Sequence, residues 1–175
     1  NLLGFDSCIY FTKNLEELEE LEAELEAELE AKSDFKSDSN SAIFPAYLIE
    51  CEDVQTLKRE LKKASSSWII GVLSSESPPV IREAISRKKV DILLDSPQNR
   101  IDYIALKMAA EKDVAVELSI SKFINSKGVR RMRLFEQTKD IVKIAAKFST
   151  PLILSSGASE FLEMRGAKQI EDFFK

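Results

Sequence analysis

The chain has 175 residues, of which 44% are hydrophobic and 31% are charged, and this composition is typical of a globular protein with one core. It contains no histidine, which excludes Ser-His-Asp and Cys-His catalysis and removes the commonest ligand of zinc and iron sites. The two cysteines, Cys8 and Cys51, are too few for a metal cage, and we expect them to be free thiols of a cytoplasmic protein.

The N-terminus carries no signal-peptide pattern, and no apolar run approaches the roughly 20 residues that span a bilayer, so we expect no membrane contact. Because the chain does not begin with methionine, we expect the natural chain to begin earlier. The net charge is −5, but residues 16–34 hold ten acidic side chains and one basic, whereas residues 35–175 hold 23 Lys and Arg against 19 Asp and Glu. The mildly basic body permits RNA binding without predicting it.

Residues 5–11 predict a first strand, and residues 14–31 predict a helix with one apolar stripe. Its opposite face is nearly all glutamate, and like charges four residues apart repel each other, so the helix needs a packing partner. We expect an outer helix that lies on a sheet, with a short coiled coil as the alternative. Residues 33–42 are polar and serine-rich, which indicates a flexible loop. The stripe is formed by Leu15, Leu18, Leu21, Leu25 and Leu29.

From residue 43 onward, short apolar runs alternate with amphipathic segments. The runs predict strands over 43–50, 68–73, 90–94, 114–119 and 151–155. The amphipathic segments predict helices over 53–64, from the Ser77-Pro78-Pro79 start, and over 100–112, 129–148, 158–164 and 167–174, with Asp53 and Ser77 as caps. The expected buried residues are Val80, Ile81, Ala84 and Ile85 in the second of these helices and Ile101, Ile104, Ala105 and Met108 in the third.

This alternation predicts a parallel sheet with helices packed outside it, either a barrel or a doubly wound sheet. The glycine-rich nucleotide-binding motifs are missing, which favours a single TIM-barrel-like α/β domain over residues 1–175. Because the chain is shorter than the usual 250 or so residues of eight βα units, we expect the barrel to lack some terminal elements.

Functional groups of parallel barrels gather where the strands end. The cationic run Lys127–Arg133 opens the helix predicted over 129–148, where arginine opposes the helix dipole, so it predicts either a phosphate site or a solvated basic turn. Phe123 and Phe135 lie near these basic residues, and we expect both to pack in the core. The candidate phosphate contacts are Arg100, Lys122, Arg131, Arg133 and Arg165, with Ser155 and Ser156 as hydrogen-bond donors.

The stretch from about 68 to 174 resembles ribonuclease P protein component 3, the thirty-kilodalton subunit family of archaea and eukaryotes. The resemblance rests on an ordered set of short motifs. They are Val90-Asp91-Ile92-Leu93, Asn99-Arg100-Ile101-Asp102, Val114-Ala115-Val116-Glu117-Leu118, Gly128-x-x-Arg131-x-Arg133, Ile153-Leu154-Ser155-Ser156-Gly157-Ala158, Arg165-Gly166 and Asp172. Two features depart from the family, namely a missing short insertion after Arg100 and Tyr103 where a histidine is usual.

The resemblance implies a TIM-barrel-like fold and a non-catalytic role in 5′ maturation of precursor tRNA, in which the ribonuclease P RNA carries out the hydrolysis. It implies binding to that RNA and to a small ferredoxin-like protein subunit, among other ribonuclease P proteins. It implies no cofactor for the protein itself, and magnesium is expected for the RNA-catalysed reaction. The acidic helix over 14–31 is expected to face away from RNA.

Two other functions remain open. A free-standing barrel hydrolase, related to metal-dependent phosphoesterases, would need a convergent acidic site at the strand ends. A pure assembly module would use the leucine stripe to bind a partner. The plausible metal ligands of the hydrolase are Glu50, Glu52, Asp91, Asp95 and Glu117, and Asp91 and Asp95 are expected to project to the same face.

Overall fold

A computed structural model describes residues 5, 7–32, 42–74, 76–98 and 101–175. Its centre is one six-stranded sheet in which every neighbouring pair is parallel and the spatial order follows the chain order. Short helical connections between parallel neighbours place the helices on one side of the sheet. The strands are β1 (Ser7–Thr12), β2 (Ala42–Cys51), β3 (Ile69–Ser74), β4 (Ile92–Leu94), β5 (Ala115–Ser119) and β6 (Leu152–Ser155).

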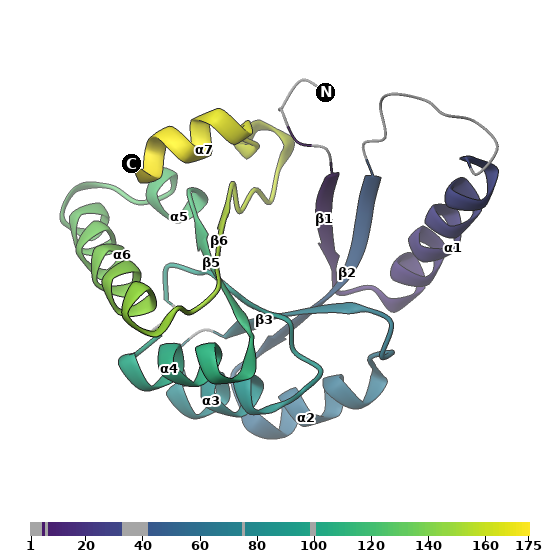
Figure 1. Ribbon diagram of the computed structural model, residues 1–175, viewed down its shortest axis with the longest axis horizontal. Coiled ribbons are helices and arrows are strands. Elements are labelled where there is room, and N and C mark those ends of the chain that lie inside the picture. The colour runs from purple at the N-terminus through teal and green to yellow at the C-terminus, as the bar shows by residue number, and fades with distance from the viewer. Residues whose placement is uncertain (1–4, 6, 33–41, 75, 99–100) are drawn as a thin grey trace.

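The sheet curls into a half-barrel with its helices on the convex side, and within the described residues the two edge strands, β1 and β6, do not pair (Figure 1). The TIM-barrel-like α/β fold predicted from the alternating pattern is confirmed, as is a barrel that is not closed. The helices are α1 (Leu15–Lys32), α2 (Val54–Lys63), α3 (Pro78–Ser86), α4 (Tyr103–Lys112), α5 (Ser121–Ile124), α6 (Gly128–Phe148) and α7 (Ala167–Phe174), and Phe161–Glu163 form the 3-10 helix η1.

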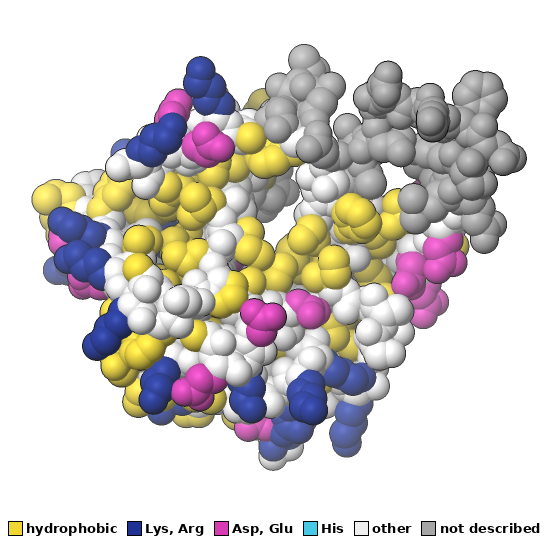
Figure 2. Space-filling model, viewed as in Figure 1, with side chains coloured by type: hydrophobic (Ala, Val, Ile, Leu, Met, Phe, Trp, Pro, Cys, Tyr) yellow, Lys and Arg dark blue, Asp and Glu magenta, His cyan; other side chains and the backbone are white. Residues whose placement is uncertain are grey.

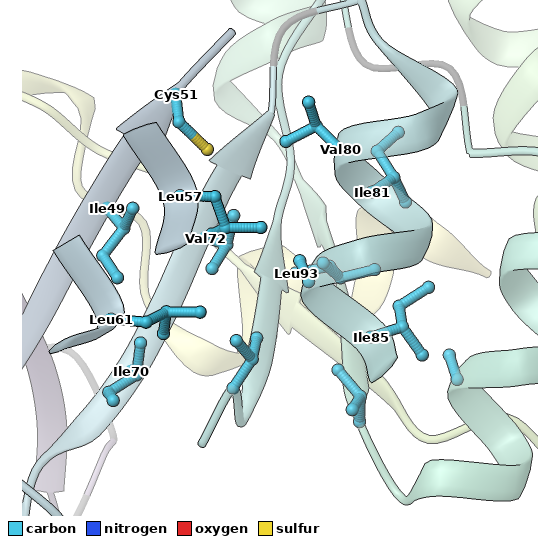
Figure 3. Close-up of a cluster of buried hydrophobic side chains, with 14 of the residues drawn as sticks. Ile49, Cys51, Leu57, Leu61, Ile70, Val72, Val80, Ile81, Ile85 and Leu93 are labelled. Atoms are coloured by element: carbon cyan, nitrogen blue, oxygen red, sulfur yellow. The ribbon is translucent and has the colours of Figure 1, made fainter. Parts of the chain in front are cut away.

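The main hydrophobic core lies between the convex face of the sheet and the outer helices (Figure 3). Leu57 and Leu61 of α2 and Ile81 and Ile85 of α3 are buried against β2, β3 and β4. Full burial of a side chain of this size stabilises the folded state by about 1.5–3 kcal/mol. The predicted inward residues of α3, from Val80 to Ile85, are confirmed.

The concave face of the sheet is filled by side chains from several strands. Phe11 of β1 and Leu94 of β4 meet over Gly71 of β3, where an added Cβ would lie 2.4 Å from a Phe11 ring carbon. Glycine is therefore required at this point for the large side chains of the concave face to approach the sheet.

The acidic helix α1 packs on β1 and β2, with Leu18 completely buried in the core and Leu15 partly buried against it. Its Glu22 accepts a 2.7 Å hydrogen bond from the indole nitrogen of Trp68. These contacts confirm the prediction of an outer helix that lies on the sheet. The free energy gained from the packing offsets the repulsion between the glutamates of the helix.

The predictions for helix caps and short segments were confirmed only in part. Asp53 caps α2 as predicted, with its carboxylate accepting from the amides of Gln55 and Thr56. Ser77 precedes α3, but within the described chain its side chain makes no capping bond. The short helix α5 was not predicted. The loop was predicted over 33–42, of which residues 33–41 lie outside the described residues and Ala42 begins β2.

The prediction that Ile104 points inward is wrong, since half of this side chain is exposed. Asp102 caps α4 by accepting from the amide of Ala105, so the helix begins at Tyr103, later than predicted. Ile104 is exposed because the face of α4 that packs on α3, α6 and β5 does not include it. The buried stripe of α4 then runs through Ala105, Leu106 and Ala109.

Cys8 is exposed and Cys51 is buried, and both are free thiols, as predicted. Burial raises the pKa of the Cys51 thiol to about 11. No helix in the described part of the chain is long and apolar enough to cross a membrane.

Candidate functional site

The carboxyl ends of β4, β5 and β6 form one edge of the half-barrel, here called the carboxyl rim, and carry a connected group of polar side chains. Asp95 directly follows β4, Glu117 and Ser119 lie on β5, and Ser155 ends β6. Lys122, on the short helix α5 that follows β5, completes the group. These five residues are called the rim cluster. Parallel strands bring them together because their carboxyl ends share an edge.

A buried ion pair lies at the centre of the rim cluster. The Lys122 ammonium is 2.8 Å from Asp95 Oδ2, and the two side chains are 4% and 7% exposed. Asp95 Oδ2 also accepts from the backbone amide of Ser119 at 2.8 Å and from its hydroxyl at 3.3 Å. Several donors around one carboxylate offset the cost of removing the pair from water.

Glu117 is the second buried carboxylate of the rim cluster. Its Oε1 accepts from the Ser155 hydroxyl at 2.6 Å, and its Oε2 accepts from the backbone amide of Asp95 at 2.8 Å. Burial raises the pKa of Glu117 above its ordinary value, while these two hydrogen bonds and Lys122 act in the opposite direction. Glu117 thereby connects the ends of β4, β5 and β6.

The loop after β6 closes over the rim cluster at Gly157. The backbone amides of Ile120 and Ser121 donate to the carbonyls of Ser155 and Ser156 at 3.1 and 3.0 Å. Gly157 then adopts a φ of +57°, and a Cβ added there would lie 2.4 Å from the Cβ of Ser119. Glycine is needed at position 157 because only glycine combines this backbone conformation with so close an approach to Ser119.

Of the acidic residues considered as metal ligands, only Asp95 and Glu117 meet, in the rim cluster. Asp91 and Asp95 were expected to project to the same face. They flank β4 at opposite ends, where Asp91 accepts a hydrogen bond from the amide of Ile70 and Asp95 pairs with Lys122, so they do not form a joint site. Glu50 pairs with Lys13. Among the described residues, no three His, Cys, Asp or Glu side chains are grouped so that they could hold a metal ion.

The predicted phosphate contacts on α6 lie at its exposed N-terminal turns. Arg133 is exposed, and Arg131 is also exposed while its Nε donates to the Ser126 carbonyl at 2.7 Å. The helix begins at Gly128, its first turn has no acidic residue, and no capping bond from the side chain of Lys127 is found in the described chain. The backbone amides of this turn are therefore available to an anion.

Arg165 follows the 3-10 helix η1, which contacts the end of α5. It donates to the carbonyls of Leu162 and Met164, and the neighbouring Glu163 accepts from the Asn125 side chain at the end of α5. Figure 2 shows Lys and Arg side chains gathered at the left edge of the molecule, where Figure 1 places α6. Arg131 and Arg133 belong to this α6 edge, whereas Arg165 lies between η1 and α7.

The remaining predicted contacts have other surroundings. Lys122 is part of the interior through its ion pair with Asp95, and the Ser155 hydroxyl is directed to Glu117. Ser156 is half-buried, with its carbonyl bound to the amide of Ser121. Arg100 lies outside the described residues. The Asp95–Lys122 pair was not predicted from the sequence. The two residues are 27 positions apart, and no sequence pattern indicates that side chains so far apart are partners.

Phe123 and Phe135 were both predicted to be core residues. Phe123 is buried, whereas Phe135 is 44% exposed although its ring centroid lies 4.5 Å from that of Phe123. Phe173 and Phe174 of α7 complete this aromatic group and hold α7 against α5 and α6.

Together, the curled parallel sheet, the rim cluster and the arginine-rich start of α6 define a protein of the TIM-barrel-like class with a candidate anion-binding surface beside its carboxyl rim. The sequence matches the family model described as RNase P subunit p30 over residues 4–175. The chain belongs to this family.

Relatives support this assignment. The chain is 40% identical over 128 residues to ribonuclease P protein component 3 of Archaeoglobus fulgidus, covering 73% of this chain and 63% of that protein. It is 30% identical over 122 residues to the Methanothermobacter thermautotrophicus protein of the same name, covering 67% of this chain and 50% of the relative. The matched regions thus span between half and two thirds of these relatives.

The fold also matches a solved structure. A chain in the cryo-EM structure of archaeal ribonuclease P with mature tRNA superposes with a TM-score of 0.76 and 21% sequence identity. The match covers 99% of this chain and 74% of the other. At this identity the likeness establishes the fold alone.

We predict that Gly157→Ala destabilises the fold more than Gly128→Ala. Both glycines have a positive φ, 57° and 54°, so each substitution meets the same backbone cost of about 1–2 kcal/mol. Only at Gly157 does the new Cβ collide with Ser119, which adds about 1–3 kcal/mol. Urea denaturation of both variants measures the difference, and equal losses of unfolding free energy would contradict the close packing described here.

We predict that Glu117→Gln changes how stability depends on pH. Because burial raises the folded-state pKa of Glu117 above the ordinary 4.5, the folded protein holds this proton more tightly than the unfolded chain. The contribution of Glu117 to stability is therefore largest below the ordinary pKa and falls as the pH rises through the raised one. The unfolding free energy of the wild type minus that of the variant should decrease over this range, and a constant difference would refute the assignment.

Proposed function

We propose that this chain is a protein subunit of ribonuclease P that binds the catalytic RNA and supports 5′ maturation of precursor tRNA without carrying out the hydrolysis itself. The observation that carries the proposal is the exposed arginine-rich start of α6 in a chain of this family. Arginines and free backbone amides together suit RNA phosphates, which they contact without reading the bases. Magnesium, in this proposal, serves the RNA.

The distribution of charge supports the same orientation. The acidic helix α1 lies on the opposite side of the half-barrel from α6 (Figure 1), and its carboxylates appear at the other edge of the surface in Figure 2. RNA that approaches the α6 side therefore meets Lys and Arg side chains and not the acidic helix, although the net charge of the chain is negative.

An exposed apolar stripe on α6 supports a protein partner beside the RNA. Val129, Met132 and Phe135 follow each other at three-residue spacing and are 66%, 69% and 44% exposed. Such a stripe favours burial against another protein. We propose that the small ferredoxin-like ribonuclease P subunit covers it.

The first prediction concerns cleavage. Precursor tRNA, ribonuclease P RNA and moderate magnesium are combined with this chain and the small partner subunit, together or separately. We expect faster cleavage when both proteins are present with the RNA, and no cleavage by the proteins alone. Cleavage by this chain without RNA, or no stimulation by a folded chain with an active partner, would contradict the proposal.

The second prediction concerns Arg133. Each phosphate contact releases bound counterions, so loss of one contact lowers the dependence of affinity on salt. We expect Arg133→Ala to weaken binding to ribonuclease P RNA and to reduce the slope of log affinity against log salt by about one unit. The matched control is Arg59→Ala on α2, since Arg59 is equally a surface arginine but lies away from α6. Equal slopes for both variants would show that Arg133 is merely solvated.

A further inference from the structure

A second basic surface lies on the convex side of the half-barrel, between α2 and the turn that follows α3. Figure 2 shows Lys and Arg side chains gathered along the lower edge of the molecule, where Figure 1 places these two helices. The surface is called the α2–α3 basic cluster and consists of Lys58, Lys62, Arg87, Lys88 and Lys89.

Contacts between α2 and the end of α3 make the cluster one continuous surface. The Lys89 ammonium donates to the backbone carbonyl of Ala64 at 2.9 Å, so the turn after α3 lies against the C-terminal end of α2. Glu83 of α3 is 3.4 Å from the Lys58 ammonium and also pairs with Arg87. The same carboxylate thus holds one cation from each helix.

The cluster carries far more positive than negative charge. Glu83 is the one carboxylate that forms ion pairs with it among the described residues, so the five cations and Glu83 together have a net charge of +4. Lys62 and Lys88 are exposed and form no ion pair within the described part of the chain. Like charges four residues apart, as at Lys58 and Lys62, repel each other. Such a concentration of charge lowers stability, and its presence in a chain of net charge −5 indicates a partner of opposite charge.

The helix dipole accounts for only part of the cluster. Lys62 lies in the last turn of α2, where a cation complements the negative end of the dipole, and Lys89 binds the last carbonyls of the same helix. Lys88 lies beyond Arg87, the C-cap of α3, where the dipole contributes little. Local stabilisation therefore leaves the excess of charge unexplained.

The composition of the surface favours a nucleic acid over a protein as the partner. Lysine is depleted in protein–protein interfaces, whose cores are enriched in apolar and aromatic side chains. Four of the five cations are lysines, and no large apolar side chain is exposed on α2 or over 86–89, two segments that the structure describes in full. These segments also expose no aromatic ring on which a base could stack. The surface therefore suits the phosphates of an RNA double helix and not unpaired bases.

The parallel topology separates this cluster from the start of α6. Helix α6 follows α5 at the carboxyl end of β5, so its N-terminal turns lie on the side of the carboxyl rim. Helices α2 and α3 run back from the carboxyl ends of β2 and β3 and end where β3 and β4 begin. The two basic surfaces thus lie at opposite edges of the sheet, and each is available to a different segment of RNA.

We propose that the α2–α3 basic cluster is a second RNA-contacting surface, which binds the phosphate backbone of an RNA double helix, so that this chain bridges two segments of ribonuclease P RNA. The inference rests on the proposed RNA-binding function and adds the bridging role to it. A protein that contacts two segments only in the folded RNA stabilises that fold by mass action. A subunit without catalytic groups of its own can support cleavage in this way.

Directed hydroxyl-radical cleavage tests the bridging role. An iron–EDTA probe is attached to the single cysteine of Lys88→Cys or Arg133→Cys, in a chain whose exposed Cys8 is changed by Cys8→Ser and whose buried Cys51 is left in place. Each labelled chain is bound to ribonuclease P RNA together with the small partner subunit. We expect both positions to cleave the RNA at two different segments, whereas the probe at Glu20→Cys, on the exposed face of α1, should leave it intact.

Salt dependence measures the phosphate contacts of the cluster. The double variant Lys62→Gln, Lys88→Gln should weaken binding to ribonuclease P RNA and lower the slope of log affinity against log salt by about two units, one for each lost contact. The matched control is Arg59→Gln with Lys63→Gln, which removes the same charge from α2, but from side chains that both pair with Glu60. The control should leave the slope nearly unchanged, and thermal melting of both double variants checks that they are folded.

The outcomes are distinct. Cleavage from position 133 without cleavage from position 88, cleavage of one and the same segment from both, or equal slopes for the two double variants would each overturn the bridging role while the proposed function stands. No cleavage from either position, together with no binding of ribonuclease P RNA, would overturn both.

Sedimentation separates RNA from a second copy of this chain as the partner. We expect the wild type and the Lys62→Gln, Lys88→Gln variant to have the same oligomeric state in the absence of RNA. Self-association that only this variant loses would assign the cluster to the acidic helix α1 of a second copy and would overturn the assignment to RNA.

Discussion

The buried ion pair between Lys122 and Asp95 is the interaction on which the carboxyl rim depends. It joins the end of β4 to helix α5, and α5 leads directly into α6. Removal of either partner would leave an uncompensated buried charge, which typically costs 3–5 kcal/mol. Glu117 extends the same network to β6 through Ser155, so the three strand ends hold one another in register. The position of the α6 arginines follows from this arrangement.

Much of the fold could be predicted because strands buried on both faces appear as short apolar runs, and helices with one buried face show a stripe. The stripe of α3 from Val80 to Ile85 is such a case, and its burial was predicted correctly. Ile104 was mispredicted because several faces of α4 are apolar, and which of them is buried depends on how the helix packs on α3, α6 and β5. Helix α5 has only four residues, which is too short for a hydrophobic periodicity, so it could not be predicted in this way.

The candidate site was less predictable for a physical reason. Arginines at a helix start are visible in the sequence because they oppose the helix dipole, and Arg131 and Arg133 are indeed exposed there. The state of a lysine depends instead on its partners in space. Lys122 was expected to contact phosphate, but the fold brings Asp95 beside it and removes both from solvent. A hydroxyl such as Thr138, which lacks a partner, can be recognised only once its surroundings are known.

Helix α6 connects the arginine-rich surface to the interior of the half-barrel. Leu134, Thr138 and Ile141 recur at spacings of three and four residues, which places them on one face of the helix. Leu134 and Thr138 are buried, whereas Arg131 and Arg133 in the preceding turns are exposed. The rim cluster holds the start of this helix in place, because its ion pair anchors α5 just before α6 begins. The network that fixes the strand ends therefore also fixes the direction in which the arginine-rich turns face.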